Sequence, residues 1–318
     1  MEYIAKTTKG LEDIAIKEVN EILKIKSKKV FKARVSFKTD SIENFIKNTR
    51  TSSEVYLLIK KFNFKDKKSL LNEIKKIKFE IKKDFVVRCS RKGNHDFKSI
   101  EIEKLAGEII HKKGFKVNLN SNEVIYLDIE DKTCLLGKLI AKDLCKRQYR
   151  FSYHNQSINA CLAASLIKLA DIKDEVLLDP FCRDSVIPIE AYFQNIKKIY
   201  ASDPEKNNIR NSKINSKLAK ANIKFSVSEI DWLDTKFKKN SVKIVTSIPF
   251  ESKRKSIEEI KPILKEFFHQ VKYISKESIV LTQKPKLAKS IALNEKLKIQ
   301  EKKIESNNIK YSIFILKK

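Results

Sequence analysis

One stretch decides the fold: residues 175–191 read Glu-Val-Leu-Leu-Asp-Pro-Phe-Cys-Arg-Asp-Ser-Val-Ile-Pro-Ile-Glu-Ala. It begins with a short apolar run, Val176–Leu178, of the length expected for a buried strand of a parallel sheet. An acid, a proline and a turn follow, and then Ile187, Ile189 and Ala191 lie in a helical pattern. A strand, an acidic turn and a helix form the first unit of a doubly wound α/β domain. In such domains the ligand lies beyond the carboxyl end of the strand, next to the helix N-terminus.

The loop in this stretch resembles that of a known family. Leu-Leu-Asp-Pro-Phe-Cys and Ile-Pro-Ile-Glu-Ala are similar to the cofactor loop of S-adenosylmethionine-dependent RNA methyltransferases that carry an RNA-binding THUMP domain ahead of a UPF0020-type catalytic domain. That family usually reads Asp-Pro-Phe-Cys-Gly-Ser-Gly-Thr, whereas Arg183 and Ser185 stand here in place of the two glycines. A side chain at a position that needs a positive φ costs about 1 kcal/mol and occupies space.

The resemblance implies that cofactor-binding residues include Asp179, Phe181, Cys182, Arg183 and Ser185. The charge on the Arg183 side chain leaves alternatives open. It would repel the sulfonium of the cofactor, or it would pair with the carboxylate of the cofactor. A pair between Arg183 and Asp184 would instead close the site.

Composition and charge limit the class of protein. At 318 residues the chain is long enough for two domains or three small ones. A hydrophobic content of 42% is typical of a folded protein and excludes a disordered one. The formal net charge of +28 attracts polyanions and favours a nucleic-acid partner. The alternative is a general excess of lysine, which the abundance of Ile, Asn and Lys also fits.

The five cysteines (Cys89, Cys134, Cys145, Cys161 and Cys182) contain no CxxC pair and no regular spacing. We therefore expect free, buried thiols. The four histidines are scattered, so no metal site is expected. No apolar segment of the signal-peptide kind begins the chain, and no window approaches 18 uncharged apolar residues. The expectation is a soluble, cytoplasmic protein without a membrane partner.

Residues 1–62 are predicted to form a ferredoxin-like unit, because their strand and helix patterns follow the order β-α-β-β-α-β. Val30–Phe37 alternates apolar and polar residues, which predicts one half-buried strand. Ser41 is expected to cap the helix that follows it. Val55–Ile59 is expected to be another strand.

Residues 63–145 are predicted to form a second domain. Ser69 is expected to open a helix, Phe85–Cys89 to be a strand, and Ser99–His111 to be a helix. The strand, the Lys-Gly-x-His-x-Phe loop behind it, the helix and two late strands resemble the THUMP domain. In the family this domain holds the acceptor end of a tRNA or a comparable RNA terminus, so the resemblance implies an RNA-binding surface here.

Five side chains are predicted to contact RNA in this domain: Arg88, Arg91, Lys92, His95 and Lys98. They lie close together at the end of the strand and in the loop that follows it, where a glycine lets the backbone approach a phosphate closely. A single lysine of this kind is more often a solvated surface charge, so the prediction depends on the cluster. The phenylalanine of the same loop is expected in the core rather than on a base.

A basic segment leads into residues 146–318. Lys-Arg-Gln-Tyr-Arg at residues 146–150 resembles the segment that enters the catalytic domain of the family. Lys146, Arg147 and Arg150 are predicted RNA contacts, with Arg147 or Arg150 exposed to phosphate and Tyr149 packed inside. The alternative is a structural strap.

Two acids follow the next strands of the predicted Rossmann-like domain. Asp203 ends the strand Ile199–Asp203, where a carboxylate can accept both hydroxyls of a ribose. The alternative is an N-cap of the next helix, and both roles can hold together. Asp231 lies where the family has an acid that meets the adenine amino group, and an exposed loop acid is the alternative. Both are predicted cofactor-binding residues.

Ser247-Ile248-Pro249-Phe250 follows the fourth buried strand. It resembles the (Asn/Asp/Ser)-Pro-Pro-(Tyr/Phe) motif of methyltransferases that act on exocyclic amino groups. Ser247, Pro249 and Phe250 are therefore the predicted catalytic residues. An oxygen acceptor localises the lone pair of a weakly nucleophilic amine, and a planar side chain stacks on the extruded base. The alternative is an ordinary turn at the end of a strand.

The predicted fold is α/β: an N-terminal ferredoxin-like unit plus a THUMP α+β module, followed by a Rossmann-like methyltransferase domain. The resemblance implies transfer of a methyl group from S-adenosylmethionine to N2 of a guanosine in tRNA. Two alternatives stay open: a catalytically impaired or inactive RNA-binding protein of the same fold, and a 23S rRNA guanine-N2-methyltransferase. The predicted partner is RNA, with tRNA first, and the predicted state is a monomer or a weak homodimer.

Overall fold

A computed structural model of the chain describes residues 1–252 and 255–318. The chain divides into two compact units, and neither is a single continuous segment. Unit 1 consists of residues 1–6, 19–49 and 53–143, and unit 2 of residues 7–18, 50–52 and 144–318. The division into three domains, with boundaries after residues 62 and 145, stays a prediction.

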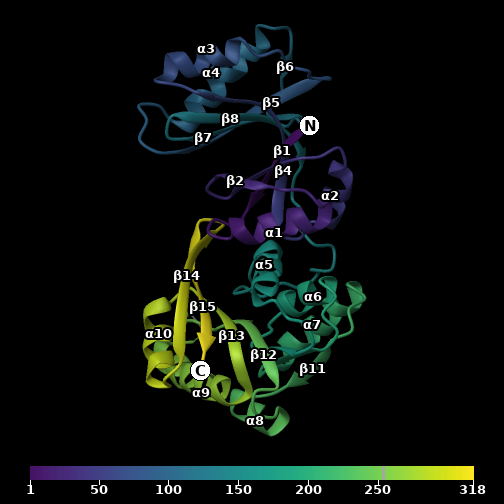
Figure 1. Ribbon diagram of the computed structural model, residues 1–318, viewed down its shortest axis with the longest axis vertical. Helices are drawn as coiled ribbons and strands as arrows, with labels where there is room; N and C mark the ends of the chain where they lie inside the picture. Colours follow the sequence, from purple (N-terminus) through teal and green to yellow (C-terminus); the bar gives the residue numbers. More distant parts are fainter. Residues whose placement is uncertain (253–254) are drawn as a thin grey trace. The chain divides into compact units, whose positions relative to one another are not determined.

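An eight-stranded sheet in the order β2-β3-β1-β4-β8-β7-β5-β6 organises unit 1 (Figure 1). Its strands are β1 (Glu2–Thr7), β2 (Lys28–Phe31), β3 (Arg34–Lys38), β4 (Ser52–Asn63), β5 (Asp84–Lys92), β6 (Lys116–Val117), β7 (Val124–Glu130) and β8 (Thr133–Ala141). The first four strands have the element order β-α-β-β-α-β that the sequence predicts. The long strand β4 pairs with β8, so one sheet runs through both halves of the unit.

The helices of this half of the chain are α1 (Glu12–Leu23), α2 (Ile42–Asn48), α3 (Lys67–Lys75) and α4 (Ser99–His111). The helices α3 and α4 bury one apolar core against β5, β7 and β8. Phe97 lies in this core at 3% exposure, which confirms the prediction for the phenylalanine of the loop.

Two local predictions in unit 1 are wrong. Val30–Phe37 is not one strand, because the chain reverses between β2 and β3, with Ala33 at φ +63° in the turn. The alternation continues across the turn and therefore hides it. Ser69 does not open α3, since the N-cap is Asp66, whose side chain accepts from the Ser69 backbone N–H at 2.7 Å.

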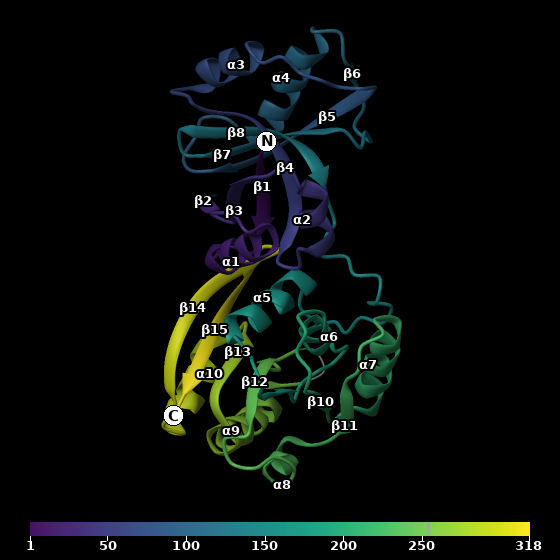
Figure 2. The ribbon, with the colours of Figure 1, turned by 45° about the vertical axis from the view of Figure 1, so that its right-hand side comes forward.

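A seven-stranded sheet in the order β11-β10-β9-β12-β13-β15-β14 organises unit 2 (Figure 2). Its strands are β9 (Val176–Asp179), β10 (Ile199–Asp203), β11 (Lys224–Val227), β12 (Val242–Ser247), β13 (Ser275–Thr282), β14 (Lys298–Ser306) and β15 (Ile309–Lys317). The pairs among β9 to β13 are parallel, and β15 joins β13 and β14 antiparallel. The strand order reverses between β9 and β12, and such a switch point is where open α/β sheets bind ligands.

Helices cover both faces of this sheet. They are α5 (Ala160–Ala170), α6 (Val186–Phe193), α7 (Lys206–Leu218), α8 (Leu233–Lys236), α9 (Ile257–Ile274) and α10 (Pro285–Asn294). One apolar core lies between the sheet and the helices α5 and α6, and a second lies between the sheet and α9 and α10. Consecutive residues of β9 point to opposite faces of the sheet. Leu177 lies in the first core and Leu178 in the second, as expected for a strand buried on both faces.

A C-terminal hairpin of β14 and β15 completes the sheet. The helix α10 continues to Asn294 and β14 begins at Lys298. The short apolar pattern at 291–297 buries Ile291, Ala292 and Leu297 against α9 and the sheet. Short apolar runs do not distinguish a helix end from a strand.

Candidate active site

A cavity of about 890 Å³ lies beyond the carboxyl ends of β9, β10 and β12 in unit 2. Six of the predicted site residues line it: Phe181, Arg183, Asp203, Asp231, Pro249 and Phe250. The cofactor loop, the acid of the second strand and the Ile-Pro-Phe segment therefore converge on one open space. The volume is in the range of ligand-binding clefts in proteins.

The loop between β9 and α6 adopts the backbone that glycines favour. Arg183 has φ +51° and Ser185 has φ +60°, both in the left-handed region, as the family pattern implies. The Arg183 backbone N–H donates to Asp203 Oδ2 at 3.0 Å. The Ser185 hydroxyl donates to Ser212 Oγ at 2.7 Å. These bonds hold a conformation that costs each residue about 1 kcal/mol.

The Arg183 side chain lies inside the site, at 7% exposure. Its guanidinium donates to the Ser247 carbonyl at 2.7 Å and to Gln156 Oε1 at 3.4 Å. Burial lowers the pKa of this guanidinium below its ordinary value, while Asp179 and Asp203 act in the opposite direction. A guanidinium has five N–H groups, so these two contacts leave some of the Arg183 donors unused.

Asp184 does not pair with Arg183, so the alternative of a closed site is wrong. The Asp184 carboxylate accepts from Arg150 Nη2 at 2.9 Å and from the Ser157 hydroxyl at 2.6 Å. These partners draw Asp184 away from the cavity. The space beside Asp203 stays open.

Asp203 lines the cavity and accepts three hydrogen bonds. Oδ2 takes the Arg183 backbone N–H, and Oδ1 takes the Glu205 N–H at 3.0 Å and Asn208 Nδ2 at 2.9 Å. The N-cap of α7 is Glu205, so the interpretation of Asp203 as an N-cap is wrong. A carboxylate has about four acceptor positions, which leaves Oδ2 able to accept from a ligand.

Asp179 lies behind the cavity rather than on its surface. Its Oδ1 accepts from the Thr246 hydroxyl at 2.6 Å and from the Phe181 N–H at 3.3 Å. Burial raises the pKa of Asp179 to about 7, against the Thr246 hydrogen bond, which lowers it. The position suits a residue that shapes the loop.

Three more predicted residues belong to the same inner layer. Like Asp179, the residues Cys182, Ser185 and Ser247 do not line the cavity. The Cys182 sulfur lies 3.7 Å from Ser212 Oγ, and burial raises the pKa of the thiol far above its ordinary value. The Cys182 and Ser185 side chains both contact Ser212 and support the loop from inside the protein.

The remaining acid and the substrate motif form the outer wall. Asp231 is exposed on the short helix η1 (Ile230–Trp232) at the cavity edge. Pro249 and Phe250 are half-buried and line the cavity, and the Phe250 carbonyl accepts from Gln156 Nε2 at 3.2 Å. No cis peptide bond occurs in residues 1–252 or 255–318, so the bond before Pro249 is trans.

Sequence reasoning missed the wall formed by His154, Asn155 and Gln156. These residues connect the basic segment to α5 and carry no recognised motif. Gln156 contacts both the cofactor loop, through Arg183, and the substrate motif, through Phe250. A run of polar side chains just before an apolar helix was the available signal.

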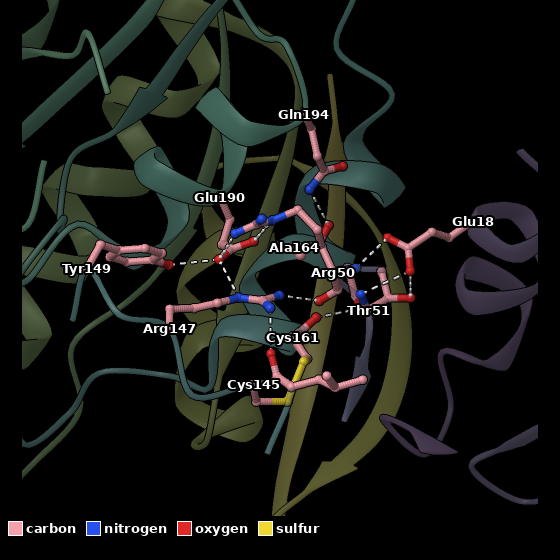
Figure 3. Close-up of polar contacts among 12 residues, drawn as sticks. Glu18, Arg50, Thr51, Cys145, Arg147, Tyr149, Cys161, Ala164, Glu190 and Gln194 are labelled. Carbon is pink, nitrogen blue, oxygen red and sulfur yellow. Dashed lines mark hydrogen bonds and ion pairs between the residues drawn. A yellow bond between two sulfur atoms is a disulfide. The ribbon is translucent and has the colours of Figure 1, made fainter. Parts of the chain in front are cut away.

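The basic segment is a structural strap for the most part. Tyr149 is buried, as predicted, and its hydroxyl donates to Glu190 Oε1 at 2.7 Å. Arg147 Nε lies 3.1 Å from the same carboxylate, and Arg150 pairs with Asp184 (Figure 3 shows the Glu190 group). The side chains of Arg147 and Arg150 are 12% and 7% exposed, so the prediction that one of them faces phosphate is wrong.

A disulfide joins this segment to α5. Cys145 and Cys161 are bonded, with their Cα atoms 5.3 Å apart (Figure 3). The prediction of free thiols is therefore wrong for these two, because a separation of 16 residues without a motif gave no signal. Cys89, Cys134 and Cys182 are free.

The predicted RNA loop of unit 1 is ordered around a glycine. Gly93 has φ +104°, and a Cβ there would lie 2.6 Å from Asp131 Oδ1. Arg91 Nη1 lies 3.1 Å from His95 Nδ1, and Arg88 lies 3.7 Å from Glu103. Lys98 is exposed at the N-terminus of α4. The loop keeps basic groups at the surface, and their contact with RNA stays a prediction.

The comparison with protein families decides the class of the catalytic part. The model of the family UPF0020, described as "RMKL-like, methyltransferase domain", matches residues 147–313, about half of the chain. The chain belongs to this family. The match to this methyltransferase domain begins in the basic segment and ends in β15, so it includes every wall of the cavity.

Curated relatives and solved structures agree with the family. A Methanocaldococcus jannaschii protein named tRNA (guanine(6)-N2)-methyltransferase is 26% identical, with 95% of each chain covered. An Archaeoglobus fulgidus protein of the same name is 30% identical over 59% of this chain, which spans about half of that relative (52%). The structure of TrmN from Thermus thermophilus has a TM-score of 0.83 at 21% identity and covers 100% of this chain and 99% of its own. This similarity confirms the α/β fold.

Of the helices in the described part of the chain, none combines the length and the apolar composition that crossing a membrane requires.

Proposed function

We propose that this RMKL-like methyltransferase transfers a methyl group from S-adenosylmethionine to N2 of a guanosine in tRNA. The observation that carries the proposal is the single open cavity shared by Arg183, Asp203, Asp231 and Phe250. A cofactor loop and a motif for amino groups have to face one space for methyl transfer to occur. The names of the two archaeal relatives support tRNA over 23S rRNA, and position 6 as the target.

The residues at the cavity surface divide the binding of the cofactor between them. Asp203 Oδ2 accepts from a ribose hydroxyl with its remaining acceptor position. Asp231, at the exposed edge, accepts from the adenine amino group. Arg183 directs its unused N–H groups to the carboxylate of the amino-acid part, since a buried guanidinium gains a charge-assisted pair there. When bound, S-adenosylmethionine supplies an electrophilic methyl group.

The substrate motif prepares the amino group. The lone pair of guanine N2 is delocalised into the ring, and acceptors for its two hydrogens localise that pair. Ser247 Oγ and the backbone carbonyl beside Pro249 are the proposed acceptors, while the Phe250 ring stacks on the base. Phe250 is half-buried and lines the cavity, so one face of its ring is accessible to a base. Ser247 is 6% exposed, so a hydrogen bond that its Oγ accepts is shielded from water.

Two measurements test the proposal. Isothermal titration with S-adenosylhomocysteine is expected to show one site, and tritium from labelled S-adenosylmethionine is expected to enter an unmodified tRNA transcript as N2-methylguanosine. A transcript with adenosine at position 6 is the matched control and is expected to stay unlabelled. Label at another guanosine would contradict position 6 as the target. If S-adenosylhomocysteine does not bind at millimolar concentration, the proposed methyl transfer is wrong.

One observation favours a second candidate, an RNA-binding relative without catalysis. The Arg183 guanidinium occupies part of the space that the family usually leaves to glycine, and it carries a charge of the same sign as the sulfonium. An RNA-binding protein without catalysis would bind tRNA with an affinity that falls steeply with salt, and it would not bind S-adenosylhomocysteine. In either case a tRNA partner would place the protein in the cytoplasm.

A further inference from the structure

Two aromatic side chains just ahead of the cavity wall face the solvent. Phe151 is 75% exposed and Tyr153 is 62% exposed, and the next residues, 154–156, line the cavity. In the described part of the chain only one other aromatic residue, Trp232, is more than half exposed. Large apolar side chains left in water next to a ligand site are typical of a binding surface.

The backbone that carries these rings is fixed. Asn215 of α7 is fully buried, and its Oδ1 accepts from the N–H groups of Phe151 and Ser152, both at 3.1 Å. Its Nδ2 donates to the Ser152 carbonyl at 2.9 Å and to the Asp184 carbonyl at 3.0 Å. One amide therefore uses all its hydrogen-bonding capacity to hold the aromatic segment against the cofactor loop.

A cation lies against one of the rings. The guanidinium carbon of Arg150 is 4.6 Å from the centroid of the Tyr153 ring. Arg150 is itself held by Asp184 at 2.9 Å, by the Ser157 hydroxyl at 2.7 Å and by the Ile158 carbonyl at 3.0 Å. The cation–π contact favours one orientation of the ring, while most of the ring surface stays open.

The charge around the segment favours a polyanion over an apolar protein partner. Four cations on α7 recur at spacings of four, three and four residues, which places them on one helix face: Lys206, Arg210, Lys213 and Lys217. All four are exposed, and within the described residues none forms an ion pair. The helix that holds the aromatic segment from its buried side thus offers positive charge on its outer side.

We propose that Phe151 and Tyr153 stack on unpaired bases that flank the target nucleotide, so that RNA reaches the cavity as a single strand. The inference rests on the proposed function, because it takes RNA as the substrate. Every base has a flat face, so aromatic stacking suits a single strand of any sequence. The contact of Asn215 with the Asp184 carbonyl joins these rings to the cofactor loop, so a stacked neighbour is bound beside the cavity.

The test removes the rings and leaves their supports. The variants Phe151→Ala and Tyr153→Ala, singly and together, are compared with wild type for the affinity of an unmodified tRNA transcript, for KM and kcat, and for binding of S-adenosylhomocysteine. Tyr273→Ala is the matched control, because Tyr273 is 46% exposed and lies on α9, outside the cavity lining. Tyr153→Phe keeps a ring and is expected to behave as wild type.

Each ring is expected to contribute about tenfold to RNA affinity, so the double variant raises Kd and KM about 100-fold while kcat changes less than threefold. The dissociation constant for S-adenosylhomocysteine stays that of wild type. The dependence of affinity on salt also keeps its slope, whereas Lys213→Ala with Lys217→Ala lowers the slope, because only the lysines release counterions.

The outcomes separate the two proposals. If wild type binds no S-adenosylhomocysteine, the proposed function fails, and RNA affinity alone still decides the role of the rings. If cofactor binding is intact and the double variant binds RNA as tightly as Tyr273→Ala, the rings do not stack on RNA and the inference is wrong. A fluorescent 2-aminopurine next to the target nucleotide gives an independent readout, since stacking quenches it in wild type and not in the double variant.

Discussion

Two groups of arginine and carboxylate side chains lie at the two ends of one short helix, α6. At its C-terminal half, Glu190 is fully buried and is held by Arg50 at 2.6 and 2.8 Å, by Arg147 at 3.1 Å and by Tyr149 at 2.7 Å (Figure 3). Before its N-terminus, Arg183 and Asp203 share only a backbone contact and border an open cavity.

The difference is one of unused hydrogen-bonding capacity. The Glu190 group is sealed, since Oε1 accepts three hydrogen bonds and Oε2 accepts one from Arg50. In the cavity group, Arg183 keeps unused donors and Asp203 an acceptor position. The same residue types therefore stabilise the fold in one place and offer a binding site in the other. Substitutions in the two groups are therefore expected to act on stability in one and on binding in the other.

The largest effect is expected from Glu190→Gln. Removing the charge leaves the partly buried guanidinium groups of Arg50 and Arg147 without the Glu190 carboxylate, and breaking a buried pair costs about 3–5 kcal/mol. Urea unfolding measures the loss. The control is Asp13→Asn, which removes an exposed partner of Lys302 and is expected to change little. An equally small loss for Glu190→Gln would mean that the group is not a structural centre.

Asp203→Asn should act mainly on binding. Replacing a charged acceptor by a neutral one of the same shape is expected to weaken S-adenosylhomocysteine binding about 10- to 100-fold, the value of one charged hydrogen bond. Isothermal titration measures it. Asp234→Asn, at an exposed acid outside the cavity lining, is the control and should bind as wild type does. Equal affinities for the two variants would remove Asp203 from the site.

Asp179 should make stability depend on pH. Burial raises its pKa to about 7 in the folded protein, above that of the unfolded chain. Between about pH 4 and pH 7 the folded state then holds the extra proton, so stability falls as pH rises, by up to about 1.4 kcal/mol per unit. Asp179→Asn removes this dependence. The unfolding free energy of the variant minus that of wild type should therefore increase from pH 5 to pH 7. A constant difference would show that the pKa of Asp179 is not raised.

The smallest effect is expected from an exposed cation of unit 1. Lys98→Ala should weaken tRNA binding only about two- to fivefold and lower the salt slope by about one, without a change in stability. Filter binding across a salt series measures both. Arg147→Ala is the contrasting variant, since this sealed arginine should alter stability far more than the salt slope. An unchanged slope for Lys98→Ala would remove this residue from the RNA surface.

Much of the catalytic half was predictable because its signals are local. The apolar run 176–178, the acid at Asp203 and the turn after β12 follow the periodicity of parallel strands, and the structure brings Asp203, Asp231 and Phe250 to one cavity. The open site and the positive φ angles at Arg183 and Ser185 agree with the family pattern.

What the sequence could not give depends on distant partners. Arg147 looks like an exposed cation until Glu190, 43 residues away, is folded beside it. The Cys145–Cys161 bond likewise depends on where the strap meets α5. The turn between β2 and β3 was missed for another reason, because alternation of polar and apolar residues persists through a tight hairpin.

Unit 2 is assembled from three separate pieces of chain, and this has a consequence for how the protein is made. Leu11 and Ile14 belong to its core, and Arg50 binds Glu190. During synthesis these three residues emerge from the ribosome well before α5 and α6. The early pieces must wait in the nascent chain for their partners. A shortened protein that starts at residue 146 would lack these pieces. The sites that Leu11 and Ile14 fill in the first core would be exposed to water, and Glu190 would keep Arg147 but lose Arg50.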